Sequence, residues 1–201
     1  DSPAPRLFFK IQSIGTHSLP LVTAAFPAVP WIFVYRDPTH VMMSHLARGK
    51  ASNALCARTR NRAGSFPQIG EVLREAGAAA GGLSATEYCA VHLGAICRSA
   101  VEEHKRGEGQ GGSRGRFVNY VGLVKSLVEE VFPNHFRLEL TEEMKENVWK
   151  VSGMYSKGRD SGRAGEFKDD SKKKEEQASE EVKAAAKKFM MPLYQTMEGF
   201  P

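Results

Sequence analysis

Residues Val29–Ser44 read VPWIFVYRDPTHVMMS, and this stretch decides how the surrounding chain is expected to fold. Its first part, Trp31–Tyr35, is an unbroken run of aromatic and β-branched residues. Such a run is typical of a strand that is buried on both faces of a parallel sheet. Pro38, with Asp37 before it, then favours the first turn of a helix. The stretch therefore predicts a strand, a tight turn and a helix in succession.

Two other apolar segments predict strands of the same sheet, Leu7–Ile11 and Arg116–Tyr120. Ser18–Phe26 is long enough for a short crossover helix between the first two strands. Ser84–Glu87 has the residues of a capping box, which predicts the start of a longer helix. Strands that alternate with helices predict an α/β domain with a mainly parallel sheet flanked by helices.

Length and composition fit one globular domain over residues 1–201. The chain is 25% charged and 41% hydrophobic, which excludes disorder, collagen and coiled coil for the chain as a whole. No apolar stretch is long enough to span a bilayer, and no secretory leader is recognised at the N-terminus. We therefore expect a soluble protein without a membrane span.

Three cysteines are too few for a disulfide framework, and an odd count leaves at least one thiol free. Cys89 and Cys97 lie on one face of a predicted helix, where buried free thiols behave as small hydrophobic groups. This cysteine usage predicts a reducing compartment, and we expect a cytoplasmic location.

The charge is distributed unevenly along the chain. Residues 1–70 hold eight Lys or Arg against two acidic residues, a balance of +6, whereas the whole chain carries +5. No carboxylate occurs from Thr39 to Gly70. Such a segment favours an anionic partner that carries phosphate or sulfate groups. A solvated basic face without a specific partner is the alternative.

Arg36 and Ser44 form the sharpest candidate site. Arg36 follows a predicted buried strand directly, and Ser44 lies eight residues later, two turns into the predicted helix. A guanidinium can bind a phosphate through two parallel hydrogen bonds, and a hydroxyl can add a third. The amides of the helix N-terminus also favour an anion. Alternatively, Arg36 pairs with Asp37 or another neighbour and only fixes the end of the strand.

This segment resembles the sulfotransferases, whose signature is a strand ending in Arg-(Asp/Asn)-Pro with a serine eight residues after the arginine. The resemblance implies that Arg36 and Ser44 hold the 3′-phosphate of the sulfate donor PAPS (3′-phosphoadenosine 5′-phosphosulfate). It also implies that Tyr120 lies near the adenine, because Phe117–Tyr120 is similar to a family strand that ends in tyrosine. The implied architecture is of the P-loop nucleotide-binding type.

A late basic segment resembles the family loop that closes over the 3′-phosphate. It aligns in two ways, which favour either Lys157 with Arg159 or Arg159 with Gly162, and the sequence leaves both open.

The chain departs from the family pattern at two places. The Gly-rich loop that cradles the 5′-phosphosulfate is not found before Leu7, so we expect the first strand and loop to be missing. The domain is then incomplete at its N-terminus, and another chain or a missing segment would complete the sheet. Lys10 resembles the strand-end lysine of the family, and the resemblance implies a catalytic role for it. Gln12, however, stands where the cytosolic enzymes have a catalytic histidine. His17 is the remaining candidate for the base.

These observations predict a sulfotransferase that moves a sulfuryl group from PAPS to a hydroxyl or amine of an unidentified acceptor. One alternative is a non-catalytic, sulfotransferase-like assembly subunit. The other is a basic nucleic-acid-binding module that uses residues 48–62 and the Gly/Arg-rich residues 105–116, which we regard as the weaker alternative. No metal is expected, since the six histidines show no ligand spacing with cysteines or acidic residues.

Overall fold

The structure is a computed structural model that describes residues 6–46, 54–153 and 170–200. Two strands form a small parallel sheet within these residues, β1 (Trp31–Tyr35) and β2 (Gly115–Asn119). Trp31 lies opposite Gly115, and Tyr35 lies opposite Asn119. The strand predicted over Trp31–Tyr35 is confirmed, but its predicted burial on both faces is not, because Val34 is exposed. The strand predicted over Arg116–Tyr120 is confirmed with a shift of one residue.

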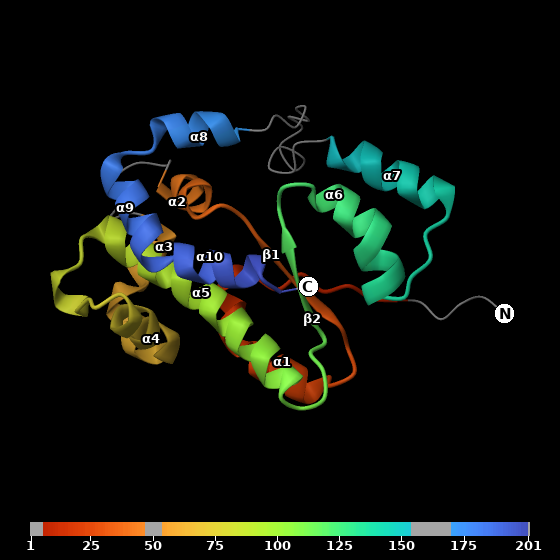
Figure 1. The fold of residues 1–201 in the computed structure, drawn as a ribbon, viewed down its shortest axis with the longest axis horizontal. Coiled ribbons are helices and arrows are strands. Elements are labelled where there is room, and N and C mark those ends of the chain that lie inside the picture. Colours follow the sequence, from red (N-terminus) through yellow and green to blue (C-terminus); the bar gives the residue numbers. More distant parts are fainter. Residues whose placement is uncertain (1–5, 47–53, 154–169, 201) are drawn as a thin grey trace.

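Helices make up most of the remaining described chain and surround the two strands (Figure 1). In chain order they are η1 (Ser13–Ser18), α1 (Leu19–Ala25), α2 (Pro38–Leu46), α3 (Leu55–Arg58), η3 (Thr59–Ser65), α4 (Pro67–Glu75), η4 (Ala80–Gly82), α5 (Ala85–Glu108), α6 (Leu123–Ser126), η5 (Leu127–His135), α7 (Glu142–Ser152), α8 (Ser171–Gln177), α9 (Glu180–Phe189) and α10 (Met191–Glu198). None of these described helices is both long and apolar enough to cross a membrane.

The prediction of a strand over Leu7–Ile11 is wrong. This segment forms no strand, and most of its apolar side chains are exposed. Phe8 packs edge-on against Phe132 and Phe136, with ring centroids 6.1 and 5.3 Å away. A β-prone sequence becomes a strand only where a neighbouring strand supplies hydrogen bonds, and in the structure this segment lies against η5 instead. The parallel sheet is therefore smaller than the sequence predicts.

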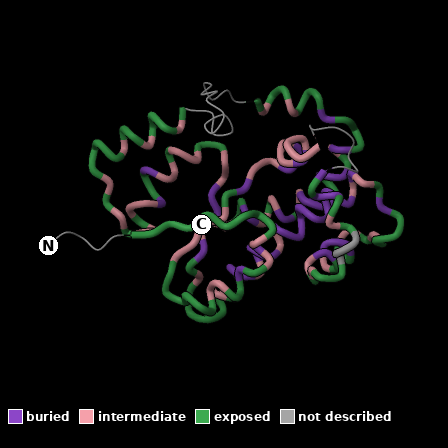
Figure 2. Tube along the Cα trace, turned by 180° about the vertical axis from the view of Figure 1, so that it is seen from behind, coloured by how far each residue is buried: buried purple, intermediate pink, exposed green. Residues whose placement is uncertain are grey.

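The core is built around α5, which begins at the predicted capping box. Ser84 Oγ accepts a hydrogen bond from the Glu87 amide at 3.1 Å, and the Glu87 carboxylate accepts one from the Ser84 amide at 2.8 Å. Figure 2 shows that the buried residues gather in the half of the molecule around α5. The half that contains α6 and α7 is mostly exposed or half-buried. The face of α5 that carries Cys89, which the sequence predicts to be buried, lies in this core.

Cys89 is not a free thiol, which corrects the prediction from the cysteine pattern. It forms a disulfide with Cys56 on α3, with 4.7 Å between the two Cα atoms, and Cys97 is the free cysteine. A separation of 33 residues gives no local signal for this pairing. It arises because α3 packs against α5 in the folded chain.

Candidate functional site

The two strands end side by side, and their carboxyl ends carry two of the predicted site residues. Arg36 and Tyr120 directly follow β1 and β2, and the Tyr120 amide donates to the Tyr35 carbonyl at 2.7 Å. The Arg36 guanidinium lies over the Tyr120 ring, 4.7 Å from its centroid. This arrangement is a cation–π contact, which orients the guanidinium without using its hydrogen-bond donors.

The turn from β1 into α2 is fixed by Asp37. Its Oδ1 accepts a hydrogen bond from the His40 amide at 3.1 Å, as expected of a residue that caps a helix. Ser44 lies two turns into α2, and its Oγ donates to the His40 carbonyl at 2.9 Å. The strand–turn–helix predicted from the sequence is confirmed, and the Ser44 hydroxyl donates to the backbone of its own helix.

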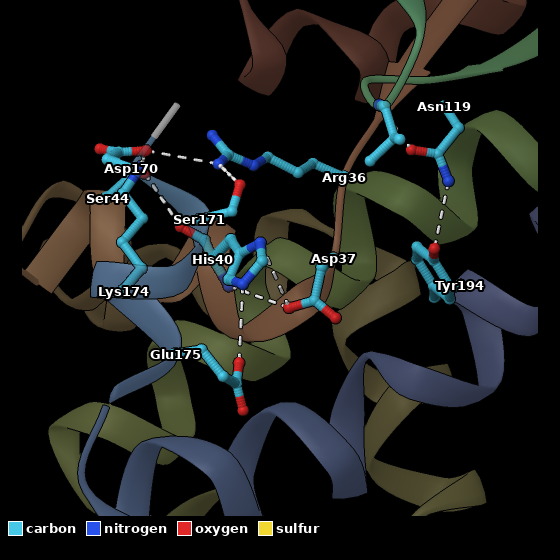
Figure 3. Close-up of polar contacts among 11 residues, drawn as sticks. Arg36, Asp37, His40, Ser44, Asn119, Asp170, Ser171, Lys174, Glu175 and Tyr194 are labelled. Carbon is cyan, nitrogen blue, oxygen red and sulfur yellow. Dashed lines mark hydrogen bonds and ion pairs between the residues drawn. The ribbon is translucent and has the colours of Figure 1, made fainter. Parts of the chain in front are cut away.

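Arg36 reaches across to the start of α8, which packs against α2. Its Nη2 donates to Ser171 Oγ at 2.7 Å and lies 3.4 Å from Asp170 Oδ1. Lys174 Nζ lies 2.8 Å from the same Asp170 oxygen. Figure 3 shows the Asp170 carboxylate between the two cationic side chains. We call Arg36, Asp170, Ser171 and Lys174 the α8 cluster.

The burial of the α8 cluster is uneven. The side chains of Arg36 and Lys174 are each 16% exposed, whereas that of Asp170 is 50% exposed. The hydrogen bond and charge of Lys174, with a further contribution from Arg36, lower the pKa of Asp170. The cluster is therefore a pair of mostly covered cations that faces a surface carboxylate.

A second polar group fastens the strand ends to α10. Tyr35 donates to Glu198, and Asn119 Nδ2 donates to Glu198 Oε1 at 2.7 Å and to Tyr194 Oη at 3.1 Å. Burial, together with the contact with Glu198, raises the pKa of Tyr35. These contacts hold β1 and β2 in place behind Arg36. No local signal in the sequence points to them, since 79 residues separate Asn119 from Glu198.

Asp37, His40 and Glu175 are the group among the described residues that could hold a metal ion. Each offers one ligand atom, and these atoms lie within 4.8 Å of one another. However, Asp37 approaches Nδ1 of His40 at 4.0 Å, whereas Glu175 approaches Nε2 at 3.6 Å. One ion binds only one nitrogen of an imidazole, so a metal would have to rearrange these contacts.

The two predicted catalytic residues, Lys10 and His17, have other surroundings than the α8 cluster. Lys10 is exposed on the segment that forms no strand. His17 lies in η1, where its Nδ1 is 2.7 Å from Ser99 Oγ and its ring stacks on Phe66. Its Nε2 is buried, and burial lowers its pKa. Within the described parts of the chain, no hydrogen bond or ion pair connects either residue with Arg36.

Lys157, Arg159 and Gly162 lie outside the described residues, so their predicted role in the late loop stays a prediction. The sequence also gave no reason to single out Lys174, which stands in a run of three lysines, Lys172–Lys174. Its contact with the Asp170 carboxylate and its lower exposure distinguish it from Lys172 and Lys173.

No protein-family model matches this chain, and neither does any curated protein or solved structure. The sulfotransferase resemblance therefore rests on the segments of the sequence quoted above. Its consequences for function are taken as a proposal.

Proposed function

We propose that the protein binds PAPS at the carboxyl end of β1 and transfers its sulfuryl group to a hydroxyl or amine acceptor. One observation carries the proposal. Arg36 lies between the end of the parallel strand β1 and the start of α2, and its guanidinium lies over the Tyr120 ring. Open α/β sheets bind their ligands in the crevice outside the carboxyl ends of their strands. The resemblance at Arg36–Ser44 supplies the identity of the ligand.

The groups around Arg36 suit a phosphate. A guanidinium binds a phosphate through two parallel bonds, which a point charge does not reproduce. The first amides of α2 add partial positive charge, although Asp37 already accepts from the His40 amide. Ser44 Oγ can turn from the His40 carbonyl to donate to the ligand. In this proposal Arg36 and Ser44 hold the 3′-phosphate, and Tyr120 lies near the adenine.

In the transfer itself, the acceptor oxygen or nitrogen forms a bond to sulfur while the bond from sulfur to the 5′-phosphate oxygen breaks. Adenosine 3′,5′-bisphosphate leaves, and the proton of the acceptor passes to a base. His17 is the base proposed from the sequence, but its Nδ1 contacts Ser99 and its Nε2 is buried. Proton transfer to His17 therefore requires it to leave this contact, since a base must reach the proton that it takes.

Titration of adenosine 3′,5′-bisphosphate by calorimetry tests the nucleotide site. The wild-type protein should saturate at one equivalent. Arg36→Ala should weaken binding by about tenfold to a hundredfold, because it removes charge-assisted hydrogen bonds. Arg36→Lys should remain weak, because an ammonium lacks the planar fork. Arg74→Ala, which removes an exposed arginine paired with Glu71 on α4, is the matched control and should bind normally.

Two other results would contradict the proposed nucleotide site. If Arg36→Ala binds the bisphosphate undiminished and melts at a lower temperature, Arg36 only ties β1 to α8 through Ser171 and Asp170. If no nucleotide saturates the wild-type protein but RNA binds with an affinity that collapses in salt, the basic N-terminal part of the chain is a nucleic-acid-binding surface instead.

A non-catalytic assembly subunit is the second candidate, and exposed apolar residues of the N-terminal segment and of β1 favour it. Leu7, Phe9 and Val34 are 76%, 82% and 42% exposed, and Val34 lies within β1. A sheet of two strands is marginal by itself, so a strand from a partner chain would stabilise it. Light scattering distinguishes the candidates, because a subunit of this kind associates with a partner or with itself without binding the bisphosphate.

A further inference from the structure

The Asp170 carboxylate occupies the place where an anionic ligand of Arg36 would lie. One of its oxygens, Oδ1, is 2.8 Å from Lys174 Nζ and 3.4 Å from Arg36 Nη2 (Figure 3). The contact with Lys174 alone is an ordinary pair four residues apart at the start of a helix. The contact with Arg36 is not local, because 134 residues separate the two side chains. Two cations from distant parts of the chain, Arg36 and Lys174, therefore contact the same Asp170 oxygen.

The uneven burial of this cluster indicates which member can be replaced. Both cations are mostly covered, and a covered cation requires a counter-charge. The carboxylate is half exposed at the protein surface, so it can turn into water at little cost. A phosphate offers more charge and more acceptor oxygens than a carboxylate and binds an arginine and a lysine more strongly.

We propose that Lys174 is the second cationic ligand of the 3′-phosphate and that Asp170 fills this position until the phosphate displaces it. The proposal deepens the function proposed above and rests on it, since it takes Arg36 as a phosphate ligand. Asp170 and the phosphate exclude each other, because two anions on the same pair of cations repel. Asp170 thereby lowers the apparent affinity of the site for every ligand that carries this phosphate.

Calorimetry on the full chain with two nucleotides tests the proposal. Lys174→Ala should weaken binding of adenosine 3′,5′-bisphosphate by about tenfold or more, because it removes a charge-assisted contact. Asp170→Asn should strengthen this binding several-fold, because it removes the competing charge and keeps the shape of the side chain. Neither variant should change the affinity for adenosine 5′-monophosphate, which lacks the 3′-phosphate. Lys174→Gln provides a second variant should the alanine variant fold poorly.

Two controls separate the local effect from a general change of charge. Lys173→Ala removes a charge from the exposed side of the same helix, and Glu175→Gln removes a carboxylate that faces His40. Both should bind the bisphosphate as the wild-type protein does. Equal effects of Lys173→Ala and Lys174→Ala would show that only net charge matters and would overturn the assignment of Lys174.

The outcomes also separate this inference from the proposed function. If the wild-type protein binds the bisphosphate and Arg36→Ala does not, while Asp170→Asn and Lys174→Ala bind normally, the nucleotide site stands and this inference is overturned. If no variant binds the bisphosphate, Asp170→Asn included, the nucleotide site and the inference fail together.

Discussion

At the scale of single residues, the contacts of Arg36 show how one side chain is positioned by three parts of the chain. Arg36 follows the end of β1, and the face of its guanidinium lies against the ring of Tyr120, which follows β2. Its Nη2 donates a hydrogen bond to Ser171 Oγ at the start of α8. A guanidinium can serve all three because its faces and its donors point in different directions. The folded chain itself therefore sets the orientation of Arg36.

Tyr120 should matter for nucleotide affinity through its ring. Tyr120→Leu removes the cation–π contact with Arg36, which is worth about 0.5–1 kcal/mol at a partly exposed site, so binding of the bisphosphate should weaken about two- to fivefold. Tyr120→Phe keeps the ring and should bind almost as the wild-type protein does. Calorimetry on the two variants checks this prediction, and equal losses in both would assign the effect to the hydroxyl group instead.

His92 should make the stability of the protein depend on pH. Burial, with smaller contributions from His17 and His45, lowers its pKa to about 4, whereas an unfolded histidine has a pKa of about 6.5. Between these two pKa values the unfolded state binds more protons than the folded state. The free energy of unfolding is therefore highest above pH 6.5 and falls as the pH drops toward 4. The loss should reach about 3 kcal/mol.

Urea unfolding at pH 7, 5.5 and 4.5 measures this effect. His92→Gln should flatten the dependence, because glutamine does not titrate in this range and still offers a polar partner to Thr59. An unchanged slope in this variant would assign the pH dependence to other buried groups.

At the scale of elements, the packing of α9 against α5 depends on a small residue. A Cβ atom added at Gly94 on α5 would lie 2.6 Å from the Phe189 carbonyl oxygen of α9, and a backbone atom cannot move aside as a side chain does. Helix α9 in turn precedes α10, whose Glu198 contacts Tyr35 and Asn119 at the strand ends. The position of the sheet relative to the helices therefore depends on this close approach.

Gly94→Ala should destabilise the protein by about 1–3 kcal/mol, because the two helices must separate. Gly70→Ala on α4 is the matched control, since a Cβ atom there meets nothing within 4 Å. That variant should be neutral or up to about 1 kcal/mol more stable, as alanine favours a helix over glycine. Chemical unfolding of both variants checks the difference, and similar values for the two would contradict the tight contact.

At the scale of the whole molecule, the disulfide between Cys56 and Cys89 joins α3 to the central helix. Disulfides persist in oxidising compartments, so this bond disagrees with the reducing, cytoplasmic surroundings predicted from the cysteine count. Closing a loop of 33 residues lowers the entropy of the unfolded chain and stabilises the fold by about 3–4 kcal/mol.

Reduction should therefore lower the melting temperature markedly, and Cys56→Ser with Cys89→Ser should reproduce this loss without a reductant. Cys97→Ser leaves the disulfide in place and should keep the response to reductant. Mass spectrometry of the protein alkylated in denaturant without reductant provides a direct check, because one cysteine should be labelled. Labelling of all three would show that the bond is absent.

The sequence by itself determined β1, α2 and the start of α5. Each has a local cause: an unbroken apolar run at Trp31–Tyr35, Asp37 and Pro38 at a helix start, and the capping box at Ser84. Local signals also placed Arg36 at the carboxyl end of a strand, and the alternation of strands and helices predicted that the strands are parallel, whereas the direct pairing of β1 with β2 is known only from the structure.

Only the tertiary structure decided which distant residues meet. Leu7–Ile11 has the composition of a strand, but strands require a partner, and the segment packs against Phe132 and Phe136 instead. The pairing of Cys56 with Cys89 and the approach of Lys174 and Asp170 to Arg36 depend on how α3 and α8 pack. Such contacts follow from the burial of apolar surface over the whole chain, and no short stretch of sequence encodes them.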